Sequence, residues 1–448
     1  MMKRLLIANR GEIVSRIMRT CDRLGIETVV VYSEADRDAP YIEKAATAYC
    51  IGPSNPARSY LDIDALVGAV KDSQADAVHP GYGFLSETAA FAEAVTAAGM
   101  KWIGPAPEIL AGIESKCYCR QLAQELGIPV TPGTLKPVTD VGEILDTAHA
   151  VGVPILLKLD KGGGGKGIEF LEDVTDRQAV TAVYERMRRI GEMAFASGDV
   201  YVEKAVPAPR HIEVQFLADD FGNVVCLGER ECSIQRRYQK LIEESPSSVI
   251  FEKEREALYG YTVKLIREMR YSGAGTIEYL RDRNGNFYFM EINARLQVEH
   301  PVTEYVTGLD LIEQQIAIAN GHALSLSQED IQLRGHAIEC RVYAEDPETF
   351  MPCPGTISGL CFPDTAGGLV RIEHALRQGS VIPPYYDPML AKVITWGEDR
   401  SSAIRSMIVA LQNFKIEGVK TTIDANLSIL QREEFAAGDF NTSFLAKE

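Results

Sequence analysis

Polar and apolar residues alternate most regularly within residues 275–301, and this alternation predicts a strand with two different faces. From Phe289 onward, every second residue is polar. The apolar residues between them suit a core, whereas the polar face comprises Glu291, Asn293, Arg295, Gln297 and Glu299. An amphipathic strand with one solvated face is ordinary, but this many reactive side chains on one short face favours a chemical role.

The residues before this strand predict its partner in a β-hairpin. Residues 276–280 form a second strand pattern, and Asn284-Gly285 favours a two-residue type I′ turn, which would set Glu278 opposite Glu291. Facing carboxylates repel each other across a sheet unless a cation lies between them. With Asn293 as a third oxygen ligand, we expect that cation to be Mg²⁺ or Mn²⁺.

Near the N-terminus, strand and helix patterns alternate as they do in a parallel sheet. They lie, in order, at 3–8, 11–25, 27–33, 48–52, 61–73, 76–83, 88–99 and 101–105. This order predicts one doubly wound α/β domain. The turn at residues 9–12 lacks the GxGxxG pattern of dinucleotide folds, so we do not expect NAD. The glycine-punctuated loop at 79–87 fits a substrate loop and a plain turn with Ser86 as helix N-cap equally well.

Residues 153–171 predict two strands joined by a glycine loop. The first strand carries Lys158, and Lys166 follows the glycines at 162–165. Backbone N–H groups of such a loop can close over phosphate oxygens, while the lysines, like Arg295 downstream, supply positive charge. The loop joins two strands and lacks the GK[ST] ending of a Walker A loop. The alternative is a flexible turn without function, which the flanking lysines disfavour.

The middle of the chain predicts several antiparallel strands, with a hairpin turn at 221–223. In the strand pattern at 200–206 the backbone suits an adenine edge, with Glu203 as an acceptor. His211 is either a ligand or a histidine satisfied within the sheet. The later patterns predict helices at 251–270, 309–321 and 401–414 and a strand at 336–346. That strand carries Arg341, which needs a partner because a lone buried guanidinium is costly.

Charge and composition narrow the class of protein. The chain has 448 residues and a formal net charge of −17, which argues against a general nucleic-acid or anionic-membrane binder. No apolar stretch approaches the length of a membrane span, and no signal-peptide pattern precedes the first strand, so we expect a cytoplasmic protein. The nine cysteines include no CxxC pair and are expected to be reduced and mostly buried.

Taken in order, the lysines, the glycine loop and the Glu, Glu, Asn face resemble an ATP-grasp enzyme, and specifically a biotin carboxylase. The resemblance spans the whole chain and rests on LLIANRGEI, HPGYGFLSE, GGGGKG, RHIEVQ, EINARLQVEHPVTE, GHAIECRVYAEDP, PPYYDPMLAKVI and GVKTT. It implies an α/β fold of three parts. These are an N-terminal doubly wound α/β domain over 1–114, an ATP-grasp domain over 115–330 with a mobile α+β lid over about 131–204, and a C-terminal mixed α+β domain with an antiparallel sheet over 331–448.

The resemblance also implies a role for each matching residue. ATP would be held by Lys116, Lys158, Gly163, Gly164, Gly165, Lys166, Gly167, Glu203, Lys204, Val206, His211, Gln235 and Tyr238. Two Mg²⁺ or Mn²⁺ ions would be held by Glu278, Glu291 and Asn293, and bicarbonate by Lys240, Arg295, Gln297 and Val298. Glu299 would be the general base, and Arg341 would stabilise the ureido oxygen of biotin near Tyr82.

The implied reaction is the ATP-dependent carboxylation of biotin by bicarbonate through carboxyphosphate. This is the first half-reaction of a biotin-dependent carboxylase, with acetyl-CoA carboxylase, and so fatty acid biosynthesis, as the expected assembly. The chain stops at Glu448 without an Ala-Met-Lys-Met acceptor motif. We therefore expect a free-standing subunit that works with a separate biotin carboxyl carrier protein and carboxyltransferase, and the resemblance implies a homodimer.

Three positions depart from the family pattern. Leu159-Asp160 stands where small residues usually follow the lid lysine, Tyr238 stands where His is usual, and Ile168-Glu169 replaces Met-Arg. An Asp near the phosphates repels them unless it points away, so the departures predict weaker ATP binding than in a typical member. Two alternatives stay open, namely another ATP-grasp ligase that makes a different acyl phosphate and a nucleotide-binding regulatory subunit without turnover.

Overall fold

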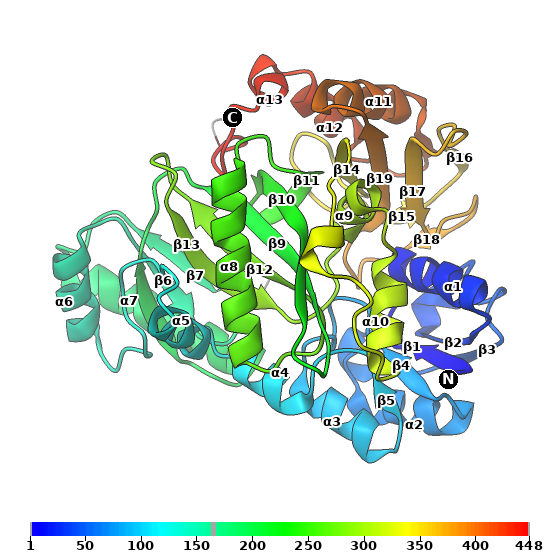
Figure 1. The fold of residues 1–448 in the computed structure, drawn as a ribbon, viewed down its shortest axis with the longest axis horizontal. Coiled ribbons are helices and arrows are strands. Elements are labelled where there is room, and N and C mark those ends of the chain that lie inside the picture. The colour runs from blue at the N-terminus through cyan, green and yellow to red at the C-terminus, as the bar shows by residue number, and fades with distance from the viewer. Residues whose placement is uncertain (1, 163–166, 447–448) are drawn as a thin grey trace.

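The N-terminal region is a parallel five-stranded sheet covered by helices, as the sequence predicts (Figure 1). The computed structural model describes residues 2–162 and 167–446. The sheet order is β3-β2-β1-β4-β5. Its elements are β1 (Arg4–Ile7), α1 (Glu12–Leu24), β2 (Glu27–Tyr32), β3 (Thr47–Cys50), α2 (Ile63–Ser73), β4 (Ala77–His79), α3 (Ala89–Ala97) and β5 (Lys101–Trp102). The N-cap of α3 is Thr88, so the alternative in which Ser86 caps this helix is wrong.

Two helices lead from this region into a small separate layer that corresponds to the predicted lid. They are α4 (Pro107–Ile113) and α5 (Lys116–Glu125). The layer is an antiparallel sheet of order β7-β6-β8 covered by two helices. Its elements are α6 (Val141–Val151), β6 (Ile155–Leu159), β7 (Ile168–Leu171), α7 (Arg177–Phe195) and β8 (Val200–Lys204). The layer has its own hydrophobic core, which includes Ile144, Leu157 and Met187.

The rest of the chain is built on one eight-stranded sheet of order β13-β12-β9-β10-β11-β14-β19-β17. Its strands are β9 (Arg210–Ala218), β10 (Val224–Arg236), β11 (Gln239–Ser245), β12 (Gly273–Arg281), β13 (Phe287–Asn293), β14 (His336–Tyr343), β17 (Val370–His374) and β19 (Met389–Gly397). Because β11 pairs with β14, the sheet is continuous across residue 330. The N-terminal sheet and the lid lie on opposite sides of this sheet in Figure 1.

Helices and short strands complete the fold. The helices are α8 (Glu252–Glu268), α9 (His300–Thr307), α10 (Leu311–Ala319), α11 (Arg400–Asn413), α12 (Ile423–Leu430) and α13 (Glu433–Ala437). Two small sheets pair β15 (Gly355–Thr356) with β18 (Val381–Ile382) and β16 (Gly359–Cys361) with β20 (Lys415–Glu417). Among the described residues, no helix is long and apolar enough to span a membrane.

The β12–β13 hairpin has the predicted register but reaches it by a different route. Glu278 does lie opposite Glu291. The turn is longer than predicted, however, because Arg281 pairs with Phe287 and only Gly285, at φ 84°, has a positive φ. This is the three-residue type of loop that needs glycine in the left-handed region, not a type I′ turn. An irregularity between Glu278 and Tyr279 then shifts the register by one residue and restores the facing pair.

The predicted strand through Glu299 is wrong in its second half, because β13 ends at Asn293. The N–H of Ala294 donates to the carboxylate of Glu87 at 2.8 Å and so has no strand partner. The chain then turns into α9, which has Pro301 in its first turn, where the missing N–H of proline costs nothing. The reactive side chains after Asn293 are therefore presented by a loop that follows the strand.

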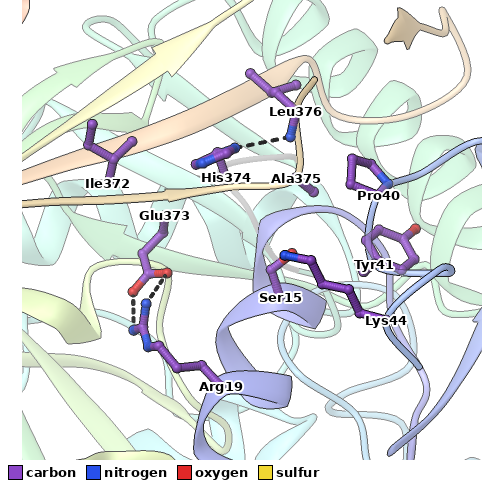
Figure 2. Close-up of a pocket in the computed structure, with 10 residues that line it drawn as sticks. All are labelled: Ser15, Arg19, Pro40, Tyr41, Lys44, Ile372, Glu373, His374, Ala375 and Leu376. Atoms are coloured by element: carbon purple, nitrogen blue, oxygen red, sulfur yellow. Dashed lines mark hydrogen bonds and ion pairs between the residues drawn. The ribbon is translucent and has the colours of Figure 1, made fainter. Parts of the chain in front are cut away.

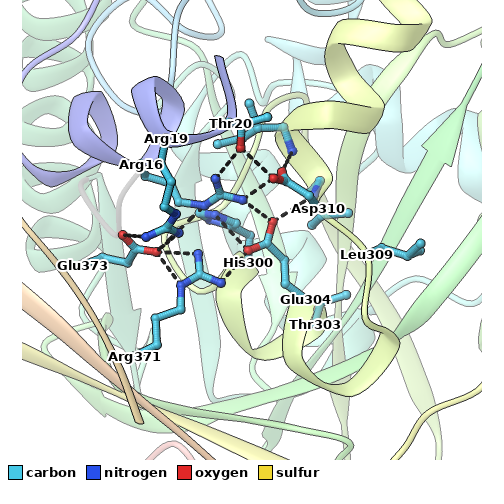
Figure 3. Close-up of polar contacts among 12 residues, drawn as sticks. Arg16, Arg19, Thr20, His300, Thr303, Glu304, Leu309, Asp310, Arg371 and Glu373 are labelled. Carbon is cyan, nitrogen blue, oxygen red and sulfur yellow. Dashed lines mark hydrogen bonds and ion pairs between the residues drawn. The ribbon is translucent and has the colours of Figure 1, made fainter. Parts of the chain in front are cut away.

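A buried polar network joins α1 to the C-terminal half of the chain (Figure 3). Arg16, with 2% of its side chain exposed, donates to Glu304 at 2.6 Å and to Asp310 at 2.8 Å. Arg371 donates to Glu304 at 2.8 Å and also pairs with Glu373. A small cavity of 230 Å³ lies beside this network, between α1, the loop around Tyr41 and β17 (Figure 2). Each buried charge has an opposite charge in contact, so the network holds the N-terminal and C-terminal regions together.

Replacement of Arg16 by Ala is expected to lower the free energy of unfolding by about 3 to 5 kcal/mol, because Glu304 and Asp310 lose a buried partner. The matched control is Arg23→Ala. Arg23 also contacts Asp310 but is 52% exposed, so its loss should cost less than about 1 kcal/mol. Urea denaturation followed by circular dichroism measures both changes. Equal effects of the two replacements would contradict the conclusion that this network holds the N-terminal and C-terminal regions together.

Candidate active site

One large cavity of 2150 Å³ collects most of the predicted site residues. It is lined from the N-terminal region, the lid and the eight-stranded sheet. The predicted residues that line it are Tyr82, Lys116, Lys158, Gly167, Val206, His211, Gln235, Tyr238, Lys240, Glu278, Glu291, Asn293, Arg295, Gln297, Val298 and Arg341. Gly163, Gly164, Gly165 and Lys166 lie outside the described residues. Of the predicted residues that the structure describes, none lines the small cavity of Figure 2.

At the inner end of the cavity, the ammonium group of Lys240 contacts three carboxylates. Its Nζ donates to Glu213 at 2.6 Å, to Glu299 at 2.7 Å and to Glu278 at 2.8 Å. Burial alone would lower the pKa of Lys240, but the three negative charges raise it well above its ordinary value. Lys240 therefore stays charged and neutralises part of an otherwise acidic cluster.

Glu299 is fully buried behind two cations and does not itself line the cavity. Its second oxygen accepts from Arg341 at 2.9 Å. Burial would raise the pKa of Glu299, but Lys240 and Arg341 hold it well below the ordinary value. Arg341 also donates to Glu243 at 2.6 Å. The prediction that this buried guanidinium has a partner is therefore confirmed. The result is an ionised carboxylate held between a lysine and an arginine that both reach the cavity.

The predicted metal face lies beside this cluster. Glu278 and Glu291 face each other across β12 and β13, and Asn293 follows on the same face. Burial and the negative charge of Glu278 raise the pKa of Glu291. Among the described residues, Lys116 is the cation nearest to Glu291, at 3.8 Å. Glu278 already has Lys240 at 2.8 Å, so Glu291 is the carboxylate of this pair that lacks close compensating charge. Facing oxygen ligands of which one is uncompensated fit a hard divalent cation.

A second grouping brings ligand atoms of His211, Glu213 and Glu278 within 4.8 Å of one another. The ammonium of Lys240 contacts both of its carboxylates. The Glu278–Glu291 face therefore suits the predicted cation better than this grouping, because the cation nearest to Glu291 among the described residues is 3.8 Å away.

The loop after β13 brings together the residues that the sequence predicts to hold bicarbonate. Arg295 is fixed by Glu87 at 2.7 Å, by Gln297 at 2.9 Å and by Asn293 at 3.0 Å. The buried amide nitrogen of Gln297 has no hydrogen-bond partner among the described residues. The carbonyl of Val298 accepts from the buried Lys392 at 2.6 Å. An oriented guanidinium beside an unpaired amide donor suits a planar oxyanion.

Two residues predicted to hold ATP, Glu203 and Lys204, do not line the cavity. The side chain of Glu203 does not line the cavity, because it is buried between Arg120 and Lys158, both at 3.2 Å. The side chain of Lys204 is also directed away, since its Nζ donates to the carbonyls of Gly152 and Val153. Glu203 is thus a side-chain partner of Lys158 and not a side-chain acceptor for adenine.

The structure shows where Asp160, Glu169 and Tyr238, the three departures from the family pattern, lie relative to the cavity. The carboxylate of Asp160 does not line the cavity and accepts hydrogen bonds from Ser115 and Cys117 at the start of α5. Glu169 pairs with Arg186 at 2.8 Å and also lies off the cavity. Tyr238 is 56% exposed at the cavity rim, in a turn with Arg237 where both residues have positive φ. That backbone conformation is strained for residues other than glycine.

Sequence reasoning missed three residues that support the site. Glu213 and Arg230 lie under Lys240, and Glu87 fixes Arg295. Period-two alternation of His211, Glu213 and Gln215 in one strand was a usable signal for Glu213. Arg230 donates to Gln215 on the neighbouring strand at 2.8 Å and to Thr303 at 2.9 Å, and the residues around Arg230 in the sequence do not indicate either contact.

Fold and site together define an ATP-grasp ligase. Residues 115–327 match the model described as the carbamoyl-phosphate synthase L chain ATP-binding domain. Residues 1–110 and 339–447 match the models of the biotin carboxylase N-terminal and C-terminal domains. The chain belongs to the biotin carboxylase family, whose members are ATP-dependent ligases that use ATP, Mg²⁺ and biotin.

Individual relatives agree with this assignment over the whole chain. Biotin carboxylase 2 of Bacillus subtilis is 47% identical over 445 residues, with 99% of each chain covered. One of the pyruvate carboxylase subunits of Methanothermobacter thermautotrophicus is 44% identical, with 99% of this chain and 90% of the relative covered.

A solved structure has a closely similar fold. It is the biotin carboxylase domain dimer of Hydrogenobacter thermophilus 2-oxoglutarate carboxylase, in complex with MgADP, ADP and bicarbonate. Its TM-score is 0.96 at 42% identity, and the match covers 100% of this chain and 98% of that one.

The pairing of Glu203 predicts a pH-dependent stability. Burial would raise the pKa of Glu203, but Lys158 and Arg120 lower it from 4.5 to about 2. The native state therefore binds fewer protons than the unfolded state between these values. The stabilisation is complete above pH 4.5 and is lost as the pH falls toward about 2. Glu203→Gln should accordingly lower the free energy of unfolding most at neutral pH, and the difference from the parent should shrink in acid.

Urea denaturation across this pH range measures the difference, with Glu169→Gln as the control on an exposed pair in the same lid. A difference that stays constant with pH would contradict the ionised pairing of Glu203 with Lys158 and Arg120.

Proposed function

We propose that this chain carboxylates the biotin of a separate carrier protein, using ATP and bicarbonate. The observation that carries the proposal is the contact of Lys240 and Arg341 with one ionised carboxylate, Glu299, beside the anion site of Arg295 and Gln297. A ligase that activates another carboxylate needs the lid and the metal face but has no use for a general base here, because its substrate carries no proton to remove.

Each region of the cavity then has one task. The lid lysine Lys158, together with Lys116, His211 and Val206, holds the nucleotide, with its phosphates directed toward the Glu278–Glu291 face. That face, with Asn293, holds two Mg²⁺ or Mn²⁺ ions, which when bound neutralise negative charge on the phosphates. Lys240, Arg295, Gln297 and the Val298 backbone hold bicarbonate. Arg341 and Tyr82 contact biotin beside the bound bicarbonate.

The reaction proceeds in three steps. Glu299 accepts the bicarbonate proton, and a carbonate oxygen attacks the γ-phosphorus of ATP, which releases ADP and forms carboxyphosphate. Carboxyphosphate divides into CO₂ and phosphate, and this phosphate takes the N1′ proton of biotin. The N1′ nitrogen then bonds to CO₂, while Arg341 stabilises the negative charge on the ureido oxygen. Glu299 acts as a base only when its contacts with Lys240 and Arg341 weaken. Bound bicarbonate weakens them because it gives both cations another anion to contact.

The assembly around this subunit is part of the proposal. We expect a biotin carboxyl carrier protein, a separate carboxyltransferase and a homodimer, and acetyl-CoA as the final acyl acceptor. Biotin carboxylase parts of a 2-oxoglutarate carboxylase and of a pyruvate carboxylase have the same fold, so the fold does not by itself select the acceptor.

Release of ADP with Mg·ATP, bicarbonate and free biotin tests the proposal. The parent should need bicarbonate and respond to biotin. Glu299→Gln should lower the rate about 10²- to 10⁴-fold, because the carbonate nucleophile is no longer formed. The variant should still bind Mg·ATP with the parent's dissociation constant, since Glu299 contacts Lys240 and Arg341 and none of the residues proposed to hold the nucleotide.

Turnover that is independent of bicarbonate would favour a different ATP-grasp ligase. Tight Mg·ATP binding without any turnover, even with a biotinylated carrier, would favour a regulatory subunit.

A further inference from the structure

Asp160, the residue that follows β6, contacts the start of α5. Its Oδ1 accepts from the backbone N–H of Cys117 at 2.7 Å and from the hydroxyl of Ser115 at 3.1 Å. Its own carbonyl accepts from the N–H of Lys116 at 3.2 Å. The side chain is buried, with 5% of the residue exposed. Asp160 thus binds three consecutive residues of another element through both its side chain and its backbone.

These contacts complete the cap of α5. The first N–H groups of a helix have no partner within the helix. Here Lys116 and Cys117 donate to Asp160, and Tyr118 donates to the Ser115 hydroxyl at 3.1 Å. A negative charge at this end also interacts favourably with the helix dipole. Since Asp160 comes from the lid strand and Ser115 from the helix side, the cap is shared between two elements.

The capped turn carries a residue of the nucleotide site. Lys116 is the first residue of α5, and its side chain lines the cavity. Its Nζ contacts the carbonyl of Gly162 and lies 3.8 Å from Glu291. The same short segment of lid, residues 160–162, therefore fixes both ends of Lys116, its backbone N–H and its ammonium group. A flanking ion pair between Lys161 and Glu114, at 3.5 Å, joins the same two segments.

We propose that Asp160 is a positioning residue for ATP binding, which acts through Lys116 by fixing the first turn of α5 against the base of the glycine loop. This inference rests on the proposed function, in which Lys116 contacts the nucleotide. It reverses the expectation drawn from the sequence, because the carboxylate strengthens the nucleotide site and does not repel the phosphates. The departure from the family pattern at Asp160 then supplies a cap for α5 and leaves the nucleotide site able to bind ATP.

The paired chemistry of Ser115 and Asp160 provides a direct test. Asp160→Ser removes the carboxylate and should raise the dissociation constant of Mg·ATP about tenfold, as expected for loss of a helix cap. Ser115→Asp places a second carboxylate 3.1 Å from the first and should also weaken binding. The double variant restores one carboxylate and one hydroxyl with their positions exchanged. It should bind Mg·ATP within about threefold of the parent.

Dependence on Lys116 separates positioning from general stabilisation. In a Lys116→Met background, Asp160→Ser should change the dissociation constant of Mg·ATP by less than about twofold, because the residue that it positions is gone. Glu169→Gln is the control for loss of a lid carboxylate and should leave binding unchanged, since Glu169 pairs with Arg186 away from the cavity. The melting temperature of every variant is measured beside its affinity.

Three results would overturn the proposal. These are an unchanged Mg·ATP affinity in Asp160→Ser, a double variant no better than the single variants, and an equal loss in the Lys116→Met background. Affinity is measured by calorimetry without turnover, so the test of Asp160 stands whether or not the chain uses bicarbonate. Failure of bicarbonate-dependent ADP release would count against the proposed function alone.

Discussion

The site depends on the contact of one buried ammonium group, that of Lys240, with three carboxylates. Glu213, Glu278 and Glu299 come from β9, β12 and the loop before α9, and they would repel one another without it. Arg230 below and Arg341 beside them supply the remaining positive charge. Because each buried charge needs its opposite, the strands and the loop are fixed in one arrangement. The same arrangement leaves the cations beside the cavity, where an anionic substrate can contact them.

The folding pattern explains why such a cluster can exist. An eight-stranded sheet brings side chains from residues 210–397 to one face, and the N-terminal sheet and the lid close two further sides of the cavity. The lid has a core of its own, whereas the N-terminal sheet and the large sheet share one that contains Val78 and Phe216. Polar contacts also connect the lid to the body. Asp160 and Arg120 provide two of them, both at α5.

Much of the fold and part of the site follow from local sequence patterns. The parallel N-terminal sheet, α8, α10 and α11 have the expected periodicity, and the facing pair Glu278 and Glu291 follows from alternation and turn position. The end of β13 was missed because alternation continued after Asn293, where a long-range contact from Glu87 takes the strand's next donor. The contacts of Glu203 and Asp160 were missed for the same kind of reason. A carboxylate's partners, such as Arg120 or the start of α5, are chosen by tertiary contacts that its own segment does not reveal.

The central claim is that an oxygen of bicarbonate attacks the γ-phosphorus of ATP in this cavity. The most direct test is to run the reaction with ¹⁸O-labelled bicarbonate, Mg·ATP and biotin, and to measure the label in the released phosphate by mass spectrometry. The account predicts phosphate that carries one oxygen from bicarbonate. Phosphate that takes its new oxygen from water would show simple hydrolysis of ATP and would contradict it.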